Sequence, residues 1–84
     1  MRIVINADFG GFGYDVAEQF EDFVYKHSYD RTDPDLIQFV ENHPEECGQL
    51  AIVEIPDNAT DYMIDEYDGL ESVIYVVDGK IHTN

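Results

Sequence analysis

A glycine-rich loop is the first segment of this sequence whose residue types could bind a ligand. Gly10–Gly13 follows a β-branched run and precedes a helical pattern, and the N-terminus of a helix after such a loop can bind phosphate. The dinucleotide fingerprint G-x-G-x-x-G is incomplete, because Val16 stands where the third glycine belongs. Asp8 and Asp15 flank the loop and would repel an anion. We therefore interpret the loop as a tight structural turn.

Histidine, cysteine and carboxylate side chains do not form a metal or catalytic pattern. His43 and Cys47 stand four residues apart, but Pro44 prevents the regular helix that would bring both to one face. A closed zinc site usually takes four Cys or His ligands, and this chain holds one Cys and three His. The acids of residues 57–68 lack the ligand order and central glycine of an EF-hand. We expect no metal, no cofactor and no enzymatic activity.

The charge of the chain is extreme for its length. In 84 residues, 19 Asp and Glu stand against 4 Lys and Arg, which gives a formal net charge of −15. Such a chain lacks the cations that binding to nucleic acid or to anionic membranes requires. A hydrophobic fraction of 44% is enough for a folded core. The single cysteine, the lack of a long apolar run and an N-terminus without signal-peptide features predict a soluble cytoplasmic protein.

Hydrophobic periodicity predicts one α+β domain over residues 1–84. We expect the order β-α-α-β-β-β-β, with a mainly antiparallel sheet and two helices packed on one face. The expected strands are Arg2–Asn6, Leu50–Ile55, a run around Tyr62–Ile64, Leu70–Val77 and Lys80–His82, and the expected helices are Asp15–Tyr29 and Pro34–Asn42. Asp68-Gly69 and Asp78-Gly79 are favoured two-residue hairpin turns.

The first expected helix has an apolar and an acidic face. Asp15 is its expected N-cap, with Glu18 three residues later in a capping-box pattern. At about 100° per residue, one face is apolar and includes His27, which we expect to be partly buried in the core. Tyr25 and Tyr29 lie on the opposite face among carboxylates, where they resemble an interface anchor. The second helix is expected to begin at Pro34 after a Thr or Asp cap.

The acids fall into two sets that we predict to bind a partner. The helical set is Asp15, Glu18, Glu21 and Asp22, accompanied by Tyr25 and Tyr29, and the second set is Asp57, Asp61, Asp65, Glu66 and Asp68. Same-face side chains on a strand stand about 6.6–6.8 Å apart, and helical neighbours at i and i+4 about 6 Å, close to the spacing of phosphates along a DNA strand. Such a surface would be attracted to a basic groove. The alternative is a solvated acidic surface that serves solubility only.

Four sequence blocks resemble a set of small phage and prophage proteins. These blocks are VINADFGGFG at 4–13, RTDPDL at 31–36, VEIPD at 53–57 and EYDG at 66–69, in the order typical of that set. The resemblance covers roughly residues 3–72 and implies phage origin and a shared fold rather than an activity. The chain departs from the set at Tyr14-Asp15, where Leu-Ser is common, and in a tail that lacks a basic, Trp-containing ending.

The segment from Asn6 to Tyr29 resembles the opening of a small acidic type I-F anti-CRISPR family. That family acts as a DNA mimic on the target-recognising subunit of the CRISPR complex. The resemblance implies that Asp8, together with the acids of the helical set, contacts basic residues of an effector.

Together these features predict a non-enzymatic phage counter-defence protein, an acidic DNA mimic that blocks the basic DNA-binding groove of a CRISPR effector. One alternative is an inhibitor of another host DNA-acting protein, such as a restriction enzyme, glycosylase or nucleoid protein. Another is a phage accessory protein whose acidity serves only solubility, and a third is a small enzyme or ligand-binding module that uses Gly10–Gly13. The target, the oligomeric state and any role of Cys47 or the histidines are left open by the sequence.

Overall fold

A computed structural model describes all 84 residues and contains five strands, two α-helices and one 3₁₀ turn. In chain order the elements are β1 (Arg2–Asn6), η1 (Glu18–Phe20), α1 (Glu21–His27), α2 (Pro34–Asn42), β2 (Leu50–Glu54), β3 (Asp61–Tyr67), β4 (Leu70–Val77) and β5 (Lys80–Thr83). This order confirms the predicted α+β class. Every strand pair is antiparallel. No helix has the length and apolar character needed to cross a membrane.

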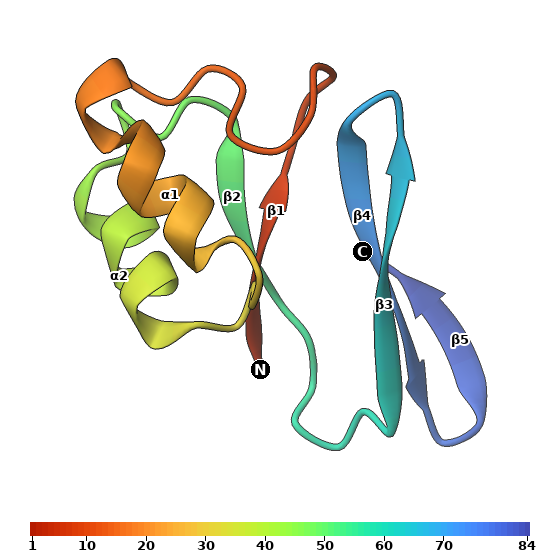
Figure 1. Cartoon of the computed structure of the whole chain (residues 1–84). Helices are drawn as coiled ribbons and strands as arrows, with labels where there is room; N and C mark the ends of the chain where they lie inside the picture. Colours follow the sequence, from red (N-terminus) through yellow and green to blue (C-terminus); the bar gives the residue numbers. More distant parts are fainter.

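The strands form two sheets, β1-β2 and β3-β4-β5, rather than one. Figure 1 shows both helices on one side of β1-β2 and the three-stranded sheet on the other. The side chains of β1 explain this arrangement, because alternate residues of a strand point to opposite faces. Val4 is buried in the core beneath the helices, whereas Ile3 and Ile5 are buried in a second core with Val73 of β4. The predicted placement of both helices on one face is therefore confirmed.

Two apolar clusters hold the layers together. The larger one lies between the helices and β1-β2 and consists of Val4, Val16, Val24, Leu36, Ile37, Phe39, Val40, Cys47 and Leu50. Phe12 and half-buried aromatic residues of η1 and α1 pack against it. The smaller one lies between the sheets and consists of Ile3, Ile5, Ile55 and Val73. Cys47 belongs to the larger core, where burial is the main cause that raises the pKa of its thiol to about 11.

The predicted start of the first helix is wrong. Asp15 is not an N-cap: η1 begins at Glu18, α1 begins at Glu21, and neither has a side-chain cap. The preceding backbone bonds to the segment before β2 instead, because the Ala17 N–H donates to the Glu46 carbonyl at 2.9 Å and Ala17 has an extended ψ of 139°. These contacts, distant in sequence, override the local capping-box pattern. The helix also ends earlier than expected, at His27.

The other predicted boundaries agree closely with the structure. Asp33 caps α2 by accepting the Asp35 N–H, and Pro34 occupies the first helical turn. Both Asp-Gly pairs form the turns of the β3-β4 and β4-β5 hairpins. β2 ends one residue earlier than predicted, and β5 continues one residue further, to Thr83.

Candidate functional site

The exposed side of η1 and α1 carries acids and tyrosines together. Glu18, Glu21 and Asp22 are exposed, and none of them has a cationic partner within 4 Å. Tyr25 and Tyr29 are 71% and 84% exposed, and their rings contact edge to face at 6.3 Å between centroids. The prediction that these tyrosines lie outside the core is confirmed. The structure places Glu18, Glu21, Asp22 and Tyr25 on η1 and α1, and Tyr29 two residues beyond the end of α1.

A shallow hollow of about 440 Å³ separates α1 from the glycine loop. Glu21, Asp22 and Tyr25 line it on the helix side, and Tyr14 lines it on the loop side. The ring of Tyr14 lies over Gly10 so closely that a Cβ on Gly10 would contact the ring carbons at 2.8 Å. Sequence reasoning missed Tyr14, although an aromatic residue directly after a glycine-rich loop was a usable signal. We call Tyr14, Glu18, Glu21, Asp22, Tyr25 and Tyr29 the helix surface.

Two predicted acids near the loop have other local roles. Asp15 is half-buried, and its Oδ1 accepts the Gln49 N–H at 3.1 Å, which fastens the loop to the segment before β2. Asp15 therefore does not extend the acidic stripe along a helix. The Oδ1 of Asp8 accepts the N–H of Phe9 at 2.8 Å. Neither residue is on α1.

The second predicted set of acids does not form a row. Asp57 pairs with the Met1 amino group at 2.7 Å, which holds the pKa of the Asp57 carboxyl below its usual range. Glu66 accepts the Gly69 N–H at 2.7 Å within the hairpin, and Asp68 occupies the turn itself.

Asp61 and Asp65 share the outward face of β3, but Met63 stands between them. Their separation of four residues corresponds to about 13 Å, roughly twice the spacing expected for a phosphate row.

Few of the 19 acids are neutralised by a neighbour. Glu41, Asp57 and Glu71 have a cationic partner, and the partner of Asp33 is His27, which is charged only when it is protonated. The Arg2–Glu41 pair lies on the surface, and the Arg31–Glu71 pair is largely buried. The remaining acids have no cation within 4 Å, so most of the net charge of −15 is directed into solvent.

The glycine loop is packed against the β3-β4 turn. The Gly10 N–H donates to the Asp68 carbonyl at 3.0 Å, and Gly69 lies against the backbone of Gly10 and Gly11. The buried side chain of Asn6 donates to the Gly69 carbonyl at 2.8 Å and so joins the same contact. This packing supports the interpretation of the loop as a structural turn, because the loop and the hairpin together close one end of the molecule.

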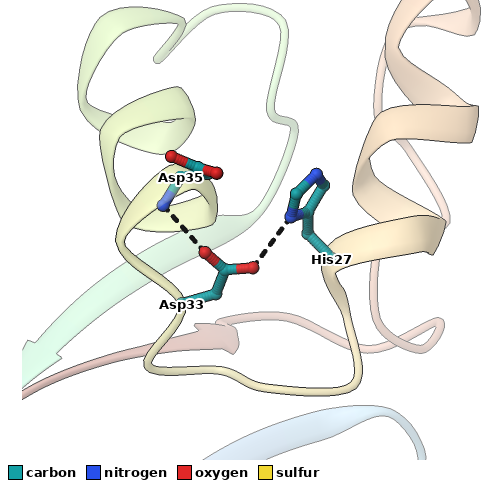
Figure 2. Close-up of side chains that lie close together, drawn as sticks. All are labelled: His27, Asp33 and Asp35. Atoms are coloured by element: carbon teal, nitrogen blue, oxygen red, sulfur yellow. Dashed lines mark hydrogen bonds and ion pairs between the residues drawn. The ribbon is translucent and has the colours of Figure 1, made fainter.

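One group of possible metal ligands lies close enough together to share a cation, and it consists of His27, Asp33 and Asp35. Figure 2 shows His27 and Asp33 pointing toward one another across the gap between α1 and α2. One ligand atom from each of the three residues lies within 4.8 Å of the other two. Both oxygens of Asp33 already have partners, His27 Nδ1 at 2.8 Å and the Asp35 N–H at 2.9 Å. The arrangement is accounted for by a hydrogen bond between two side chains combined with a helix cap.

The Asp33 pair predicts a specific pH dependence of stability. The hydrogen bond with His27, followed by that with the Asp35 N–H, lowers the pKa of Asp33 below the ordinary value of 3.8. A carboxyl with a depressed folded-state pKa contributes stability above its unfolded-state pKa and loses it as the pH falls through the folded-state value. Asp33→Asn can still cap α2. We expect its free energy of unfolding to lie furthest below that of the native chain above a pH of about 4, and the two values to approach one another at lower pH.

Urea unfolding between neutral and strongly acidic pH measures this difference. The same substitution in a His27→Ala background is the control, and there the difference is expected to depend less on pH. A difference in free energy of unfolding between Asp33→Asn and the native chain that stays constant over the whole pH range would contradict a stabilising role of the Asp33 carboxylate.

Comparison with protein-family models, with curated proteins and with solved structures finds no match to this chain.

Proposed function

We propose that the protein is a non-enzymatic inhibitor that imitates DNA and occupies the basic nucleic-acid groove of a host protein. The observation that carries this proposal is the helix surface, where three carboxylates without cationic partners lie beside exposed tyrosines. Glu21 and Asp22 occupy the first turn of α1, and Glu18 lies in the 3₁₀ turn directly before it, so the three carboxylates follow one another along one short stretch of chain. Within this proposal, the inhibitor acts in the host cytoplasm.

Charge and aromatic contacts have separate tasks in this mechanism. The carboxylates attract the basic groove over a distance and then occupy positions meant for phosphates. Tyr25 and Tyr29 contribute contact area with little loss of side-chain freedom, as tyrosines do in other interfaces. A like-charged surface would be rejected, which gives selectivity against acidic proteins. The most specific target that we propose is the DNA-binding groove of a CRISPR effector that acts on phage DNA, in keeping with the anti-CRISPR resemblance of residues 6–29.

A matched pair of charge reversals tests the role of the helix surface. Glu21→Lys/Asp22→Lys changes the helix surface, and Glu45→Lys/Glu54→Lys makes the same change in net charge at exposed acids elsewhere. We expect the first variant to inhibit DNA binding by a purified type I-F effector at least tenfold more weakly, because the loss of a hot-spot residue at the centre of an interface costs about 2 kcal/mol or more. The second variant should remain within about threefold of the native protein, because peripheral charges mainly alter the association rate.

The measurement is the inhibition constant in a DNA-binding assay at several salt concentrations, with folding of each variant checked by circular dichroism. Inhibition by the native protein should weaken steeply as salt rises. Equal losses in both variants would show that only net charge matters and would contradict the helix surface. Inhibition of a restriction enzyme, glycosylase or nucleoid protein, but not of the CRISPR effector, would retain the DNA mimic and replace its target. Inhibition of none of them would overturn the proposal.

A further inference from the structure

The three-stranded sheet has one face that no other element covers. Figure 1 shows β3-β4-β5 at the side of the molecule away from the helices, with β1-β2 against only one of its faces. The pairing register identifies the side chains that share the opposite face. These residues are Asp61, Met63, Asp65 and Tyr67 on β3, Leu70, Ser72, Ile74 and Val76 on β4, and Ile81 and Thr83 on β5. We call this set the outer sheet face.

The centre of the outer sheet face is apolar. Ile74 is paired with Met63, and Val76 is paired with Ile81, so these four side chains form neighbouring cross-strand pairs. Met63 is 57% exposed and Ile81 is 74% exposed, so large apolar side chains on both strands that flank β4 are left mostly in solvent. Tyr67, which is 72% exposed, extends the apolar area toward the β3-β4 turn.

The central strand has the composition of a strand that is covered on both faces. In an antiparallel sheet with one solvated face, apolar and polar residues alternate. Val73 and Tyr75 of β4 point toward the core between the sheets, and the alternate residues Ile74 and Val76 are equally apolar although they point outward. The outward residues of β4 therefore fit a surface that is buried in a complex, since solubility alone would favour polar residues there.

Charge determines which partner this face suits. Asp61 and Asp65 border the apolar centre, and no Lys or Arg belongs to the face, because Lys80 pairs with Val77 and points to the other side. A second copy of this chain would bring another net charge of −15 within a Debye length of about 8 Å. A partner with cations at the edge of its apolar patch would be attracted instead.

We propose that the outer sheet face is the docking surface for a protein partner that presents aliphatic or aromatic side chains bordered by Lys or Arg. The partner's apolar side chains contact Met63, Ile74 and Ile81, and its cations pair with Asp61 and Asp65. This inference goes beyond the proposed function, because none of these residues belongs to the helix surface. A chain with both surfaces can bind one partner at two places or two partners at once.

Three synthetic peptides provide a defined probe of this face. The first alternates Leu and Lys, the second alternates Leu and Glu, and the third alternates Ser and Lys. We expect the Leu/Lys peptide to bind the native protein and to shift the amide resonances of β3, β4 and β5, because it combines apolar groups with cations. The Leu/Glu peptide should not bind, and the Ser/Lys peptide should bind at least tenfold more weakly than the Leu/Lys peptide.

Two variants complete the test with matched added charge. Met63→Asp/Ile81→Asp should weaken Leu/Lys binding at least tenfold, and Gln38→Asp/Asn42→Asp, which adds the same charge at exposed positions of α2, should leave it within about threefold. Both variants alter exposed side chains, and thermal unfolding verifies that each is folded. Equal weakening by both variants, or resonance shifts confined to α1, would overturn the proposal. A native protein that is a dimer by light scattering, and a monomer as Met63→Asp/Ile81→Asp, would also overturn it, because the occupant would then be a second copy.

Discussion

Arg31→Ala is expected to destabilise the protein by about 3–5 kcal/mol, because it leaves a buried carboxylate without its cation. Arg31 and Glu71 have side-chain exposures of only 19% and 8%, and their contact is bidentate, with nitrogen-to-oxygen distances of 2.7 and 3.0 Å. A loss of this size is a large part of the stability of a small domain, which is typically about 5–15 kcal/mol. If the stability of the native protein is about 5 kcal/mol, a loss of that size would leave about half of the molecules unfolded.

The position of Arg31 explains why so much depends on it. Its guanidinium lies 3.7 Å from the ring centroid of Phe12 and donates to the Val4 carbonyl at 3.2 Å. Glu71 in turn accepts the Asn6 N–H at 2.7 Å. The pair therefore satisfies backbone groups along the edge of β1 that β2 does not pair, and joins that edge to β4. Removing the cation disturbs the glycine loop, β1 and the second sheet together.

Arg2→Ala is the matched control for this prediction. Arg2 forms an ion pair with Glu41 at 3.0 Å, but the two side chains are 42% and 48% exposed. Solvent screens such a pair, so its loss should destabilise the protein far less than the loss of the buried pair. Urea unfolding at neutral pH measures both values. If the two substitutions cost the same, the Arg31–Glu71 pair does not act as a buried pair.

A double variant separates the buried charge from the packing of the arginine. Arg31→Met/Glu71→Gln removes both charges and keeps an acceptor for the Asn6 N–H. We expect it to be more stable than Arg31→Ala, because replacing both partners removes the uncompensated carboxylate. A double variant as unstable as Arg31→Ala would show that the guanidinium acts mainly through its contacts with Phe12 and Val4.

The elements that local sequence determines could be predicted, and those fixed by distant contacts could not. The Asp-Gly turns and the Asp33-Pro34 start of α2 follow from the conformational preferences of the residues themselves. The capping-box pattern at Asp15 is equally local, but the bonds of Asp15 to Gln49 and of Ala17 to Glu46 override it. The division of the strands into two sheets was also not predictable, because it depends on side chains that fill the gap between β1 and β4.

The candidate site shows the same limit. Periodicity over the expected helix was enough to identify the outward side chains Glu18, Glu21, Asp22, Tyr25 and Tyr29, although the helix itself ends before Tyr29. Glu66 was included among the binding acids because it lies in an acidic run, yet its carboxylate bonds within the hairpin. Arg31 and Glu71 are 40 residues apart, and no periodic pattern relates a loop arginine to a strand acid at that distance.

Gly69→Ala is the second substitution with a large expected effect, about 2–5 kcal/mol. Gly69 has a φ of +87°, where a Cβ costs about 1–2 kcal/mol. A Cβ there would also overlap the Gly11 N–H group and approach Gly10 N to 2.8 Å. These are backbone atoms, which cannot rotate away as the end of a side chain can, so the loop must move. Overpacking of this kind adds about 1–3 kcal/mol.

Gly79→Ala isolates the contribution of that contact. Gly79 occupies the same position of the second Asp-Gly turn with a φ of +75°, but a Cβ on it would meet nothing within 4 Å. The free energy of unfolding of this variant should therefore fall only by the backbone strain, about 1–2 kcal/mol. The difference between the two free energies of unfolding measures the packing of the glycine loop on the β3-β4 turn. A clear excess for Gly69→Ala would mean that the loop backbone is occupied by the hairpin and is not open to an anion, whereas equal costs would restore the loop as a candidate ligand site.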